Sequence, residues 1–337
     1  MSGMRPTGRL HIGHYYGTLV NWLEFQKQYD CFFSIVDWHA LTTKYNESAQ
    51  IKQNVFEVLL DWLSVGINPE QATVYLQSAI PEIAILHLLL SMITPQNWVE
   101  REPTLKDMIK MLAGDESEAS AKATYGLIGY PVLMTADILI FKGNLIPVGK
   151  DQESHLEFAR DIARRFNNLY KVNYFPEPKP KFTLTPLIKG LDGQKMGKSA
   201  ENDIKIADTN ELTIAKITKA ITDRSRISLS DPGHTDLCEV PYPLYKIITD
   251  KAIQNQVKNE CESALIGCLD CKKQLANHIN DFFGPIREKR AILAKNPDEV
   301  FKILAYGNHQ ARKIAIQTLK DVEEIMGFSV LDQCELF

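Results

Sequence analysis

Two short basic motifs contain the residue types that handle phosphate. The first lies in the glycine-rich opening SGMRPTGRLHIGHYYG, where His11 and His14 flank Gly13. A glycine-rich turn that leads into a helix presents backbone N–H groups and a favourable dipole to an anion. Glycine also lets a ligand approach the backbone closely. The same pattern is typical of an ordinary strand–turn–helix with two surface histidines, so this motif alone leaves both interpretations open.

The second motif is KMGKS at residues 195–199, directly after a Leu-Asp-Gly turn. Lys195 and Lys198 are three residues apart, and such a pair is suited to hold a pyrophosphate leaving group and neutralise its charge. A charged surface loop is the alternative interpretation. The two motifs together, in this order at the two ends of one α/β segment, favour a nucleotide site.

A third candidate lies on the apolar segment YPVLMTADILI (130–140), which we interpret as a helix opened by Pro131. Met134 and Asp137 are three residues apart and therefore share a face of that helix. One interpretation is an aromatic pocket in which Asp137 accepts a hydrogen bond. The alternative is a carboxylate in the first half of a helix, where the dipole favours negative charge.

The elements that position these residues alternate between strand and helix in the first half of the chain. We expect strands at Cys31–Asp37, Thr73–Gln77 and Leu145–Val148, and helices at Ile51–Val65, Pro81–Ile93 and from the cap Asp151 to about Asn167. This alternation predicts a parallel sheet with helices on both faces. From about Asn210 onward the patterns are helical, which places a boundary near residue 202. We interpret Pro176–Lys181 (PEPKPK) as a mobile segment.

Four cysteines in the second half suggest a metal centre. Cys238, Cys261, Cys268 and Cys271 have 22, 6 and 2 residues between them. Four cysteines that end in C-x-x-C can close around Zn²⁺ or an iron–sulfur cluster, and spacing does not distinguish these. Four reduced core thiols are the third interpretation.

The bulk composition excludes several classes of protein. The 337 residues are 45% hydrophobic and 24% charged, as in ordinary globular proteins, with a formal net charge of −4. A nucleic-acid partner must therefore meet a local basic face. Because we find neither a signal peptide nor an apolar run near the roughly 20 residues of a membrane span, we expect a cytoplasmic protein without a membrane partner.

HIGH at 11–14 and KMGKS at 195–199 resemble the paired signatures of class I aminoacyl-tRNA synthetases. Over nearly the whole chain the sequence is most similar to tryptophanyl-tRNA synthetases, although Gly197 replaces the usual first serine of KMSKS. The resemblance implies a Rossmann-type catalytic domain (1–202) and a helical anticodon-binding domain (203–337). It also implies ATP and Mg²⁺ as cofactors, L-tryptophan and tRNA(Trp) as substrates, a homodimer and, in a subset of the family, a 4Fe–4S cluster on these four cysteines.

The resemblance also implies a role for individual residues. The catalytic residues are His11, His14, Lys195 and Lys198. ATP contacts carry over onto Arg5, Pro6, Thr7, Gly13, His14, Gly149, Lys150, Asp151, Lys195, Met196, Gly197, Lys198 and Ser199. Tryptophan contacts carry over onto His39, Met134, Asp137, Ile146, Val148 and Gln152. An indole N–H can only donate a hydrogen bond, which suits the carboxylate of Asp137.

Two of these roles have simpler alternatives. Asp151 also fits a plain helix cap, and His39 also fits a core histidine. Arg5 stands where many relatives have glutamine, and an arginine suits phosphate. The tyrosyl enzyme shares both signatures, and Met134 with Asp137 favours tryptophan over tyrosine. A synthetase-like protein that binds without ligating is disfavoured by the intact lysines and by His14.

Overall fold

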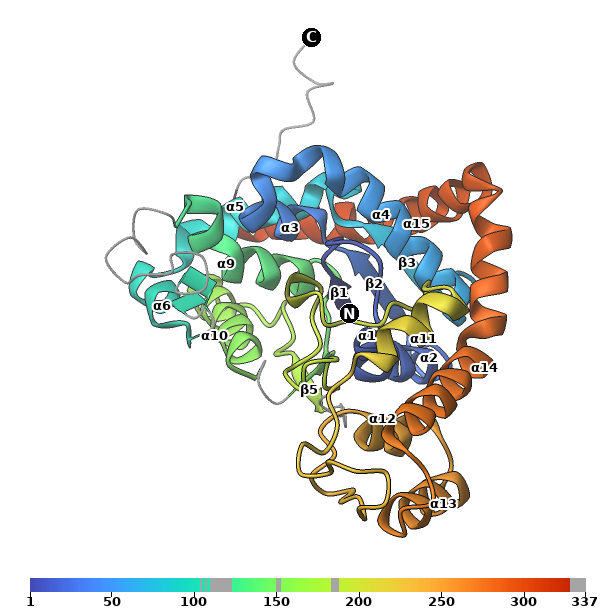
Figure 1. Ribbon diagram of the computed structural model, residues 1–337. Helices are drawn as coiled ribbons and strands as arrows, with labels where there is room; N and C mark the ends of the chain where they lie inside the picture. Colours follow the sequence, from blue (N-terminus) through green and yellow to red (C-terminus); the bar gives the residue numbers. More distant parts are fainter. Residues whose placement is uncertain (104, 107, 110–122, 150–152, 183–187, 328–337) are drawn as a thin grey trace.

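The computed structural model describes residues 1–103, 105–106, 108–109, 123–149, 153–182 and 188–327 (Figure 1). Two sets of parallel strands form its centre. Strands β1 (Ser2–Met4), β2 (Cys31–Ile35) and β3 (Ala72–Leu76) form one sheet in the order β1-β2-β3. Strands β4 (Leu145–Val148) and β5 (Lys179–Phe182) form the second. The Met1 ammonium donates to the Leu145 carbonyl at 3.4 Å, so β4 lies beside the β1 edge.

Helices surround these strands, and the predicted α/β class with a parallel sheet is confirmed. In the first half the helical elements are α1 (Ile12–His14), a π-helical turn (Tyr15–Leu19), α2 (Val20–Phe25), α3 (Asp37–Lys44), α4 (Ser48–Val65), α5 (Pro81–Ile93), α6 (Gln96–Arg101), α9 (Tyr125–Leu139) and α10 (Glu153–Tyr170). In the second half they are α11 (Asn210–Thr218), α12 (Pro241–Ile248), α13 (Lys251–Glu262), α14 (Cys268–Ala294) and α15 (Pro297–Met326).

Two expectations about local structure are wrong. Helix α9 does not open at Pro131 but six residues earlier, because the Thr124 hydroxyl caps it by accepting from the Leu127 N–H at 3.2 Å. The segment Pro176–Lys181 is not a mobile stretch, since its end forms β5 and pairs in parallel with β4. Such pairing depends on a distant strand, which proline-rich local sequence does not reveal.

Helix α15 lies against the outer edge of the sheet, beside β3 (Figure 1). Its Gly307 approaches so closely that a Cβ atom there would be 1.8 Å from the Val74 carbonyl oxygen. The next residue, Asn308, accepts a hydrogen bond from the Leu76 N–H at 2.8 Å. The helical second half therefore packs directly on the sheet. Among the described residues, no helix is long and apolar enough to cross a membrane.

Candidate active site

Main-chain hydrogen bonds hold the two signature loops together. The Ile12 N–H donates to the Ile204 carbonyl at 2.9 Å, and the Ile206 N–H donates to the Leu10 carbonyl at 2.9 Å. The first hydrogen bond joins the HIGH turn to the segment just after KMGKS. The second joins Leu10, the residue before the HIGH turn, to the same segment. The fold thus brings both motifs, nearly 190 residues apart, to one place.

Lys198 reaches from its own loop into the first one. Its Nζ donates to the Gly8 carbonyl at 2.6 Å and to the Thr7 hydroxyl at 3.4 Å. Burial lowers the pKa of Lys198 to about 8. An ammonium group therefore lies over the glycine-rich turn, where a phosphate would be attracted to it.

The two histidines of the first motif lie in contact and are neutral. Their ring centroids are 3.7 Å apart with the planes tilted by 42°, and the backbone N–H of His11 donates to His14 Nδ1 at 3.3 Å. Gly13 permits this, because a Cβ there would be 2.8 Å from His11 Nδ1. Burial lowers the pKa of His11 to about 4 and of His14 to about 2, so both are uncharged at neutral pH. His11 Nδ1 is buried without a hydrogen-bond partner in the described structure, which leaves it for a ligand.

The KMGKS loop is shaped by Asn202, which the sequence did not point to. Its Oδ1 accepts from the Gly197 N–H at 2.9 Å, and its Nδ2 donates to Asp192 at 2.7 Å and to the Lys195 carbonyl at 3.2 Å. Met196 is buried, while the Lys195 side chain is exposed. Gly197 has extended backbone (φ −159°, ψ 146°) and open space around a Cβ, so this backbone does not require glycine.

At the other end of the site, Asp137 is 2% exposed, and two side chains already bond to its carboxylate. Gln77 Nε2 donates to its two oxygens at 2.9 and 2.8 Å, and His39 Nε2 lies 2.9 Å from Oδ2. Gln77 is itself held, since its Oε1 accepts from the Trp38 N–H at 3.1 Å. A carboxylate has about four acceptor positions, so one more donor can be accommodated.

Helix α9 presents Tyr130, Met134 and Asp137 at spacings of four and three residues, hence on one face. Ile146 of β4 is buried, and Val148 and Met134 pack against the same hydrophobic cluster. Gln77 and Tyr130 were missed by sequence reasoning. The sequence predicts Gln77 only as the last residue of a strand, although a polar residue at a strand's carboxyl end is itself a signal.

The remaining predicted residues divide between described and undescribed parts. Pro6 is buried, Thr7 and Arg5 are exposed beside Lys198, and Gly149 follows β4 partly buried. Lys150, Asp151, Gln152 and the side chain of Ser199 lie outside the described residues.

Comparison with known proteins defines the family. The family model "tRNA synthetases class I (W and Y)" matches residues 1–284. The tryptophan–tRNA ligase of Borreliella burgdorferi is 43% identical over 98% of this chain and 93% of that protein, and that of Aquifex aeolicus is 36% identical over 97% and 98%. The chain belongs to the tryptophanyl-tRNA synthetases.

A solved structure agrees with this assignment. The crystal structure of tryptophanyl-tRNA synthetase from Campylobacter jejuni, complexed with ADP and tryptophan, has a TM-score of 0.87 to this chain at 33% identity. It covers 96% of this chain and 98% of its own. The predicted activity is therefore confirmed at the level of the family: the chain is a tryptophan–tRNA ligase, a class I aminoacyl-tRNA synthetase.

The four cysteines of this synthetase line one small cavity of about 20 Å³. Burial and, to a smaller extent, nearby Cys238 and Cys261 raise the pKa of Cys271 to about 12. A Cβ at Gly233 would be 2.4 Å from Cys261 Sγ, so the chain folds tightly over this thiol. The donor set fits a Cys₄ centre. As the thiols stand, however, the described part of the chain contains no group of three or more His, Cys, Asp or Glu side chains in metal-binding arrangement.

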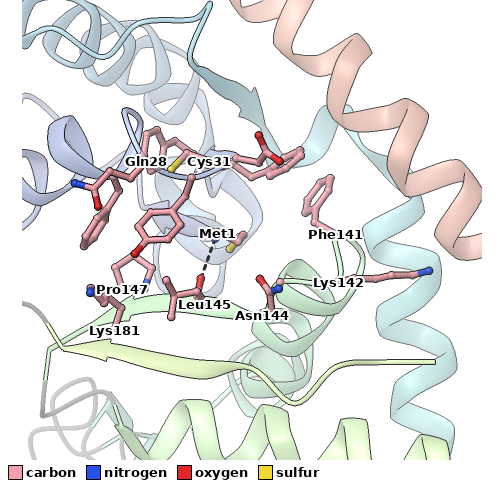
Figure 2. Close-up of a pocket in the computed structure, with 15 residues that line it drawn as sticks. Met1, Gln28, Cys31, Phe141, Lys142, Asn144, Leu145, Pro147 and Lys181 are labelled. Atoms are coloured by element: carbon pink, nitrogen blue, oxygen red, sulfur yellow. Dashed lines mark hydrogen bonds between the residues drawn. The ribbon is translucent and has the colours of Figure 1, made fainter. Parts of the chain in front are cut away.

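A larger cavity of about 490 Å³ lies away from the signature loops. Figure 2 shows it between Cys31, where β2 begins, and Leu145, where β4 begins, with Met1, Phe141 and Lys181 also in its wall. These are the amino ends of parallel strands, whereas ligands of open α/β sheets bind at the carboxyl ends. None of the predicted site residues that the structure describes lines this cavity.

Proposed function

We propose that the chain joins L-tryptophan to ATP as tryptophanyl-adenylate and then transfers the tryptophanyl group to tRNA(Trp). The tryptophan carboxylate attacks the α-phosphorus of ATP, and pyrophosphate leaves with the electron pair of the broken P–O bond. No protein nucleophile is needed, so the protein contributes position and charge stabilisation. The observation that carries this proposal is the hydrogen bond from Lys198 Nζ, in the second signature loop, to the Gly8 carbonyl in the first.

Each end of the site takes one part of the reaction. Neutral His11 and His14 donate hydrogen bonds to the phosphates, while Lys195 and Lys198 bind the pyrophosphate. Mg²⁺ arrives with ATP, because this ion is held mainly by phosphate oxygens. Asp137 accepts from the indole N–H. We retain Gly149 and Asp151 for the ribose and Gln152 for the amino acid head group.

The test is ATP–pyrophosphate exchange with single amino acids. Tryptophan should support exchange and tyrosine should not. Exchange with tyrosine would indicate the tyrosyl activity, and the absence of exchange with any amino acid would indicate a protein that binds without ligating.

The lowered pKa of Lys198 predicts that activity falls at alkaline pH. Above its pKa of about 8 the lysine loses its charge, so kcat/KM for ATP in the exchange assay should fall as pH rises through about 8. Lys198→Arg keeps its charge and should remove this fall even if its rate is lower. An identical alkaline fall in the arginine variant would assign it to another group.

We further propose that residues 203–337 bind the anticodon region of tRNA and that the chain forms a homodimer in the cytoplasm. An apolar face supports the dimer. Ile85, Leu88 and Met92 share one side of α5 and are exposed, Met92 by 70%. Helix α9 packs on α5 and exposes Tyr125 and Ile128. A pair of such faces can bury one another. Light scattering that returns the mass of one chain would contradict the dimer.

For the four cysteines we propose a 4Fe–4S cluster, with Zn²⁺ as the alternative. When bound, either centre would cross-link the loop at Cys238 to α13 and α14, and Cys238, Cys261, Cys268 and Cys271 would hold it as thiolates. The cavity of about 20 Å³ has room for about one water molecule. A single ion fits there with little movement, so Zn²⁺ stays the alternative, and a cubane cluster would bind with the four thiols spread apart.

Anaerobic purification distinguishes these centres. The cluster predicts brown protein that contains iron and sulfide, and zinc predicts one Zn²⁺ per chain without iron. Cys268→Ser should lose the centre and reduce tRNA charging more than adenylate formation, because Cys268 lies in the helical half, away from both signature loops. Protein free of metal under anaerobic conditions would leave reduced thiols as the correct interpretation.

A further inference from the structure

Helix α14, in the helical second half, reaches both signature loops with side chains of one face. It packs against α11 and α4 (Figure 1). Phe283, Arg287 and Arg290 are four and three residues apart on it and therefore share that face. Phe283 is fully buried, and its ring meets the ring of Tyr15, directly after HIGH, edge-on with 5.2 Å between the centroids. The face that carries both arginines thus packs against the first signature turn.

Arg290 supports the first loop through a carboxylate on α4. Its Nε donates to Asp61 Oδ1 at 2.6 Å, and Asp61 Oδ2 accepts from the Leu10 N–H, directly before HIGH, at 2.7 Å. Arg290 is 8% exposed, and Asp61 is fully buried. Glu57, one turn earlier on α4, accepts from Arg290 and also from Arg9 Nε at 2.8 Å. An arginine on α14 therefore holds the carboxylate that holds the main chain before HIGH.

This buried ion pair does more than join two helices. Removing both charges from water costs free energy, and apolar side chains of similar volume often stabilise a fold equally well. An apolar pair, however, would offer no acceptor to the buried Leu10 N–H, and an unpaired buried donor is itself costly. The Asp61–Arg290 pair is therefore suited to orient the loop at Leu10.

Arg287 supports the segment that follows the second loop. Its Nε donates to the Ile206 carbonyl at 3.0 Å, just after KMGKS. Its two terminal nitrogens donate to the side-chain oxygens of Asn210, Asn280 and Thr213 at 2.8, 2.7 and 3.1 Å. These bonds fix the orientation of the guanidinium group. Because the Ile206 N–H also donates to the Leu10 carbonyl at 2.9 Å, α14 holds two main-chain points that are bonded to each other.

We propose that Arg287 and Arg290 are positioning residues that set the spacing of the two signature loops for ATP. The long helix of the second half thereby completes the nucleotide site. A displacement of about 1 Å at a reacting group can cost about 100-fold in rate, so this spacing matters for catalysis. The amino acid end is held separately, by Gln77 and His39 at Asp137. This inference rests on the proposed function, because it takes ATP as the ligand of these loops.

The kinetic test compares the KM for ATP with the Kd of tryptophan. Arg287→Met removes the guanidinium group, whose hydrogen-bond acceptors are all neutral, so it leaves no buried carboxylate without its partner. We expect the KM for ATP to rise at least about 10-fold and the Kd of tryptophan to change by less than about two-fold. Arg290→Lys keeps the charge but loses the fork that reaches Asp61 and Glu57 together, so the KM for ATP should rise at least about three-fold.

Arg312→Met is the matched control. Arg312 of α15 donates to Glu82 of α5 at 2.9 Å, so it also joins the helical half to the first half, but neither helix carries a signature loop. Its KM for ATP should equal that of the wild type. An unchanged KM for ATP in Arg287→Met overturns the proposal. An equal loss of ATP and tryptophan binding also overturns it, because that result indicates a purely structural role.

Amide hydrogen exchange tests the positioning role without any ligand. In Arg287→Met and Arg290→Lys the peptides that cover residues 8–14 and 203–208 should exchange at least about five-fold faster, while β2 and β3 keep their wild-type rates. Faster exchange throughout the chain indicates lost global stability and overturns the proposal, as does unchanged exchange in both peptides.

A double variant tests the route through Asp61. Arg290→Met added to Asp61→Ala should raise the KM for ATP no further than Asp61→Ala alone. A further rise overturns that route. Wild-type protein without tryptophan-dependent exchange would instead contradict the proposed function, and hydrogen exchange would still decide the positioning role.

Discussion

Lys195→Ala should lower the rate of tryptophan-dependent ATP–pyrophosphate exchange by at least about 10-fold, which is the scale of losing one charge partner of the transition state. The Lys195 backbone is held by Asn202, whereas its side chain is exposed and free to meet a ligand. The substitution therefore removes a cation without disturbing the loop. The Kd of tryptophan should barely change, because Asp137 and Met134 lie at the other end of the site.

Two further variants make this prediction specific. Lys195→Arg retains the charge and should recover part of the lost rate. Lys219→Ala removes an exposed lysine at the end of α11 and should leave exchange unchanged. Full activity of Lys195→Ala would remove the phosphate role from this residue and leave Lys198 as the cation of that loop.

Asp137→Ala should raise the KM for tryptophan by about 10-fold or more, equivalent to roughly 1.5–3 kcal/mol for a hydrogen bond to a charged group. It should also narrow the difference in kcat/KM between tryptophan and phenylalanine. The sequence alone predicts that bound phenylalanine leaves the Asp137 carboxylate without any hydrogen-bond partner. In the structure Gln77 and His39 already bond to it, so phenylalanine leaves only one acceptor position empty. We therefore expect discrimination to fall by about 10-fold, and not by the larger factor of an unpaired charge.

The controls for Asp137→Ala separate chemistry from folding. The change leaves the Gln77 amide without its acceptor, so the thermal midpoint should be measured alongside the kinetics. The KM for ATP should stay the same. Lys195→Ala should lower kcat/KM for tryptophan and phenylalanine by the same factor. If Asp137→Ala retains full discrimination, the carboxylate serves the helix and not the indole.

Sequence reasoning succeeded where the signal is local. The bounds of α5 (Pro81–Ile93) and β4 (Leu145–Val148) match the structure residue for residue. Pro81 marks a first helical turn, and β4 is a short apolar run with turn residues before it. The end of α4 at Gly66 was also expected, and Gly66 adopts φ +114°, which favours glycine.

It failed where a distant partner decides the outcome. β5 exists because β4 provides a strand to pair with, and its own sequence KPKF is poor strand sequence. Gln77 matters because Asp137 lies opposite it, 60 residues along the chain. Glu102, just after α6, likewise lies 3.2 Å from the His155 ring of α10, which is 53 residues further along the chain. A single sequence contains these residues but not their distances, so their roles became visible only in three dimensions.

The packing of α15 against β3 has a consequence for synthesis of the chain. The Leu76 N–H donates its hydrogen bond to Asn308, which is synthesised 232 residues later. At the ribosome's pace of roughly 5–20 residues per second, that interval is on the order of ten to fifty seconds. During it the growing polypeptide exposes an open strand edge, the kind that templates pairing with other chains. The emerging protein is therefore vulnerable to aggregation through this edge until its last helix, α15, has been translated.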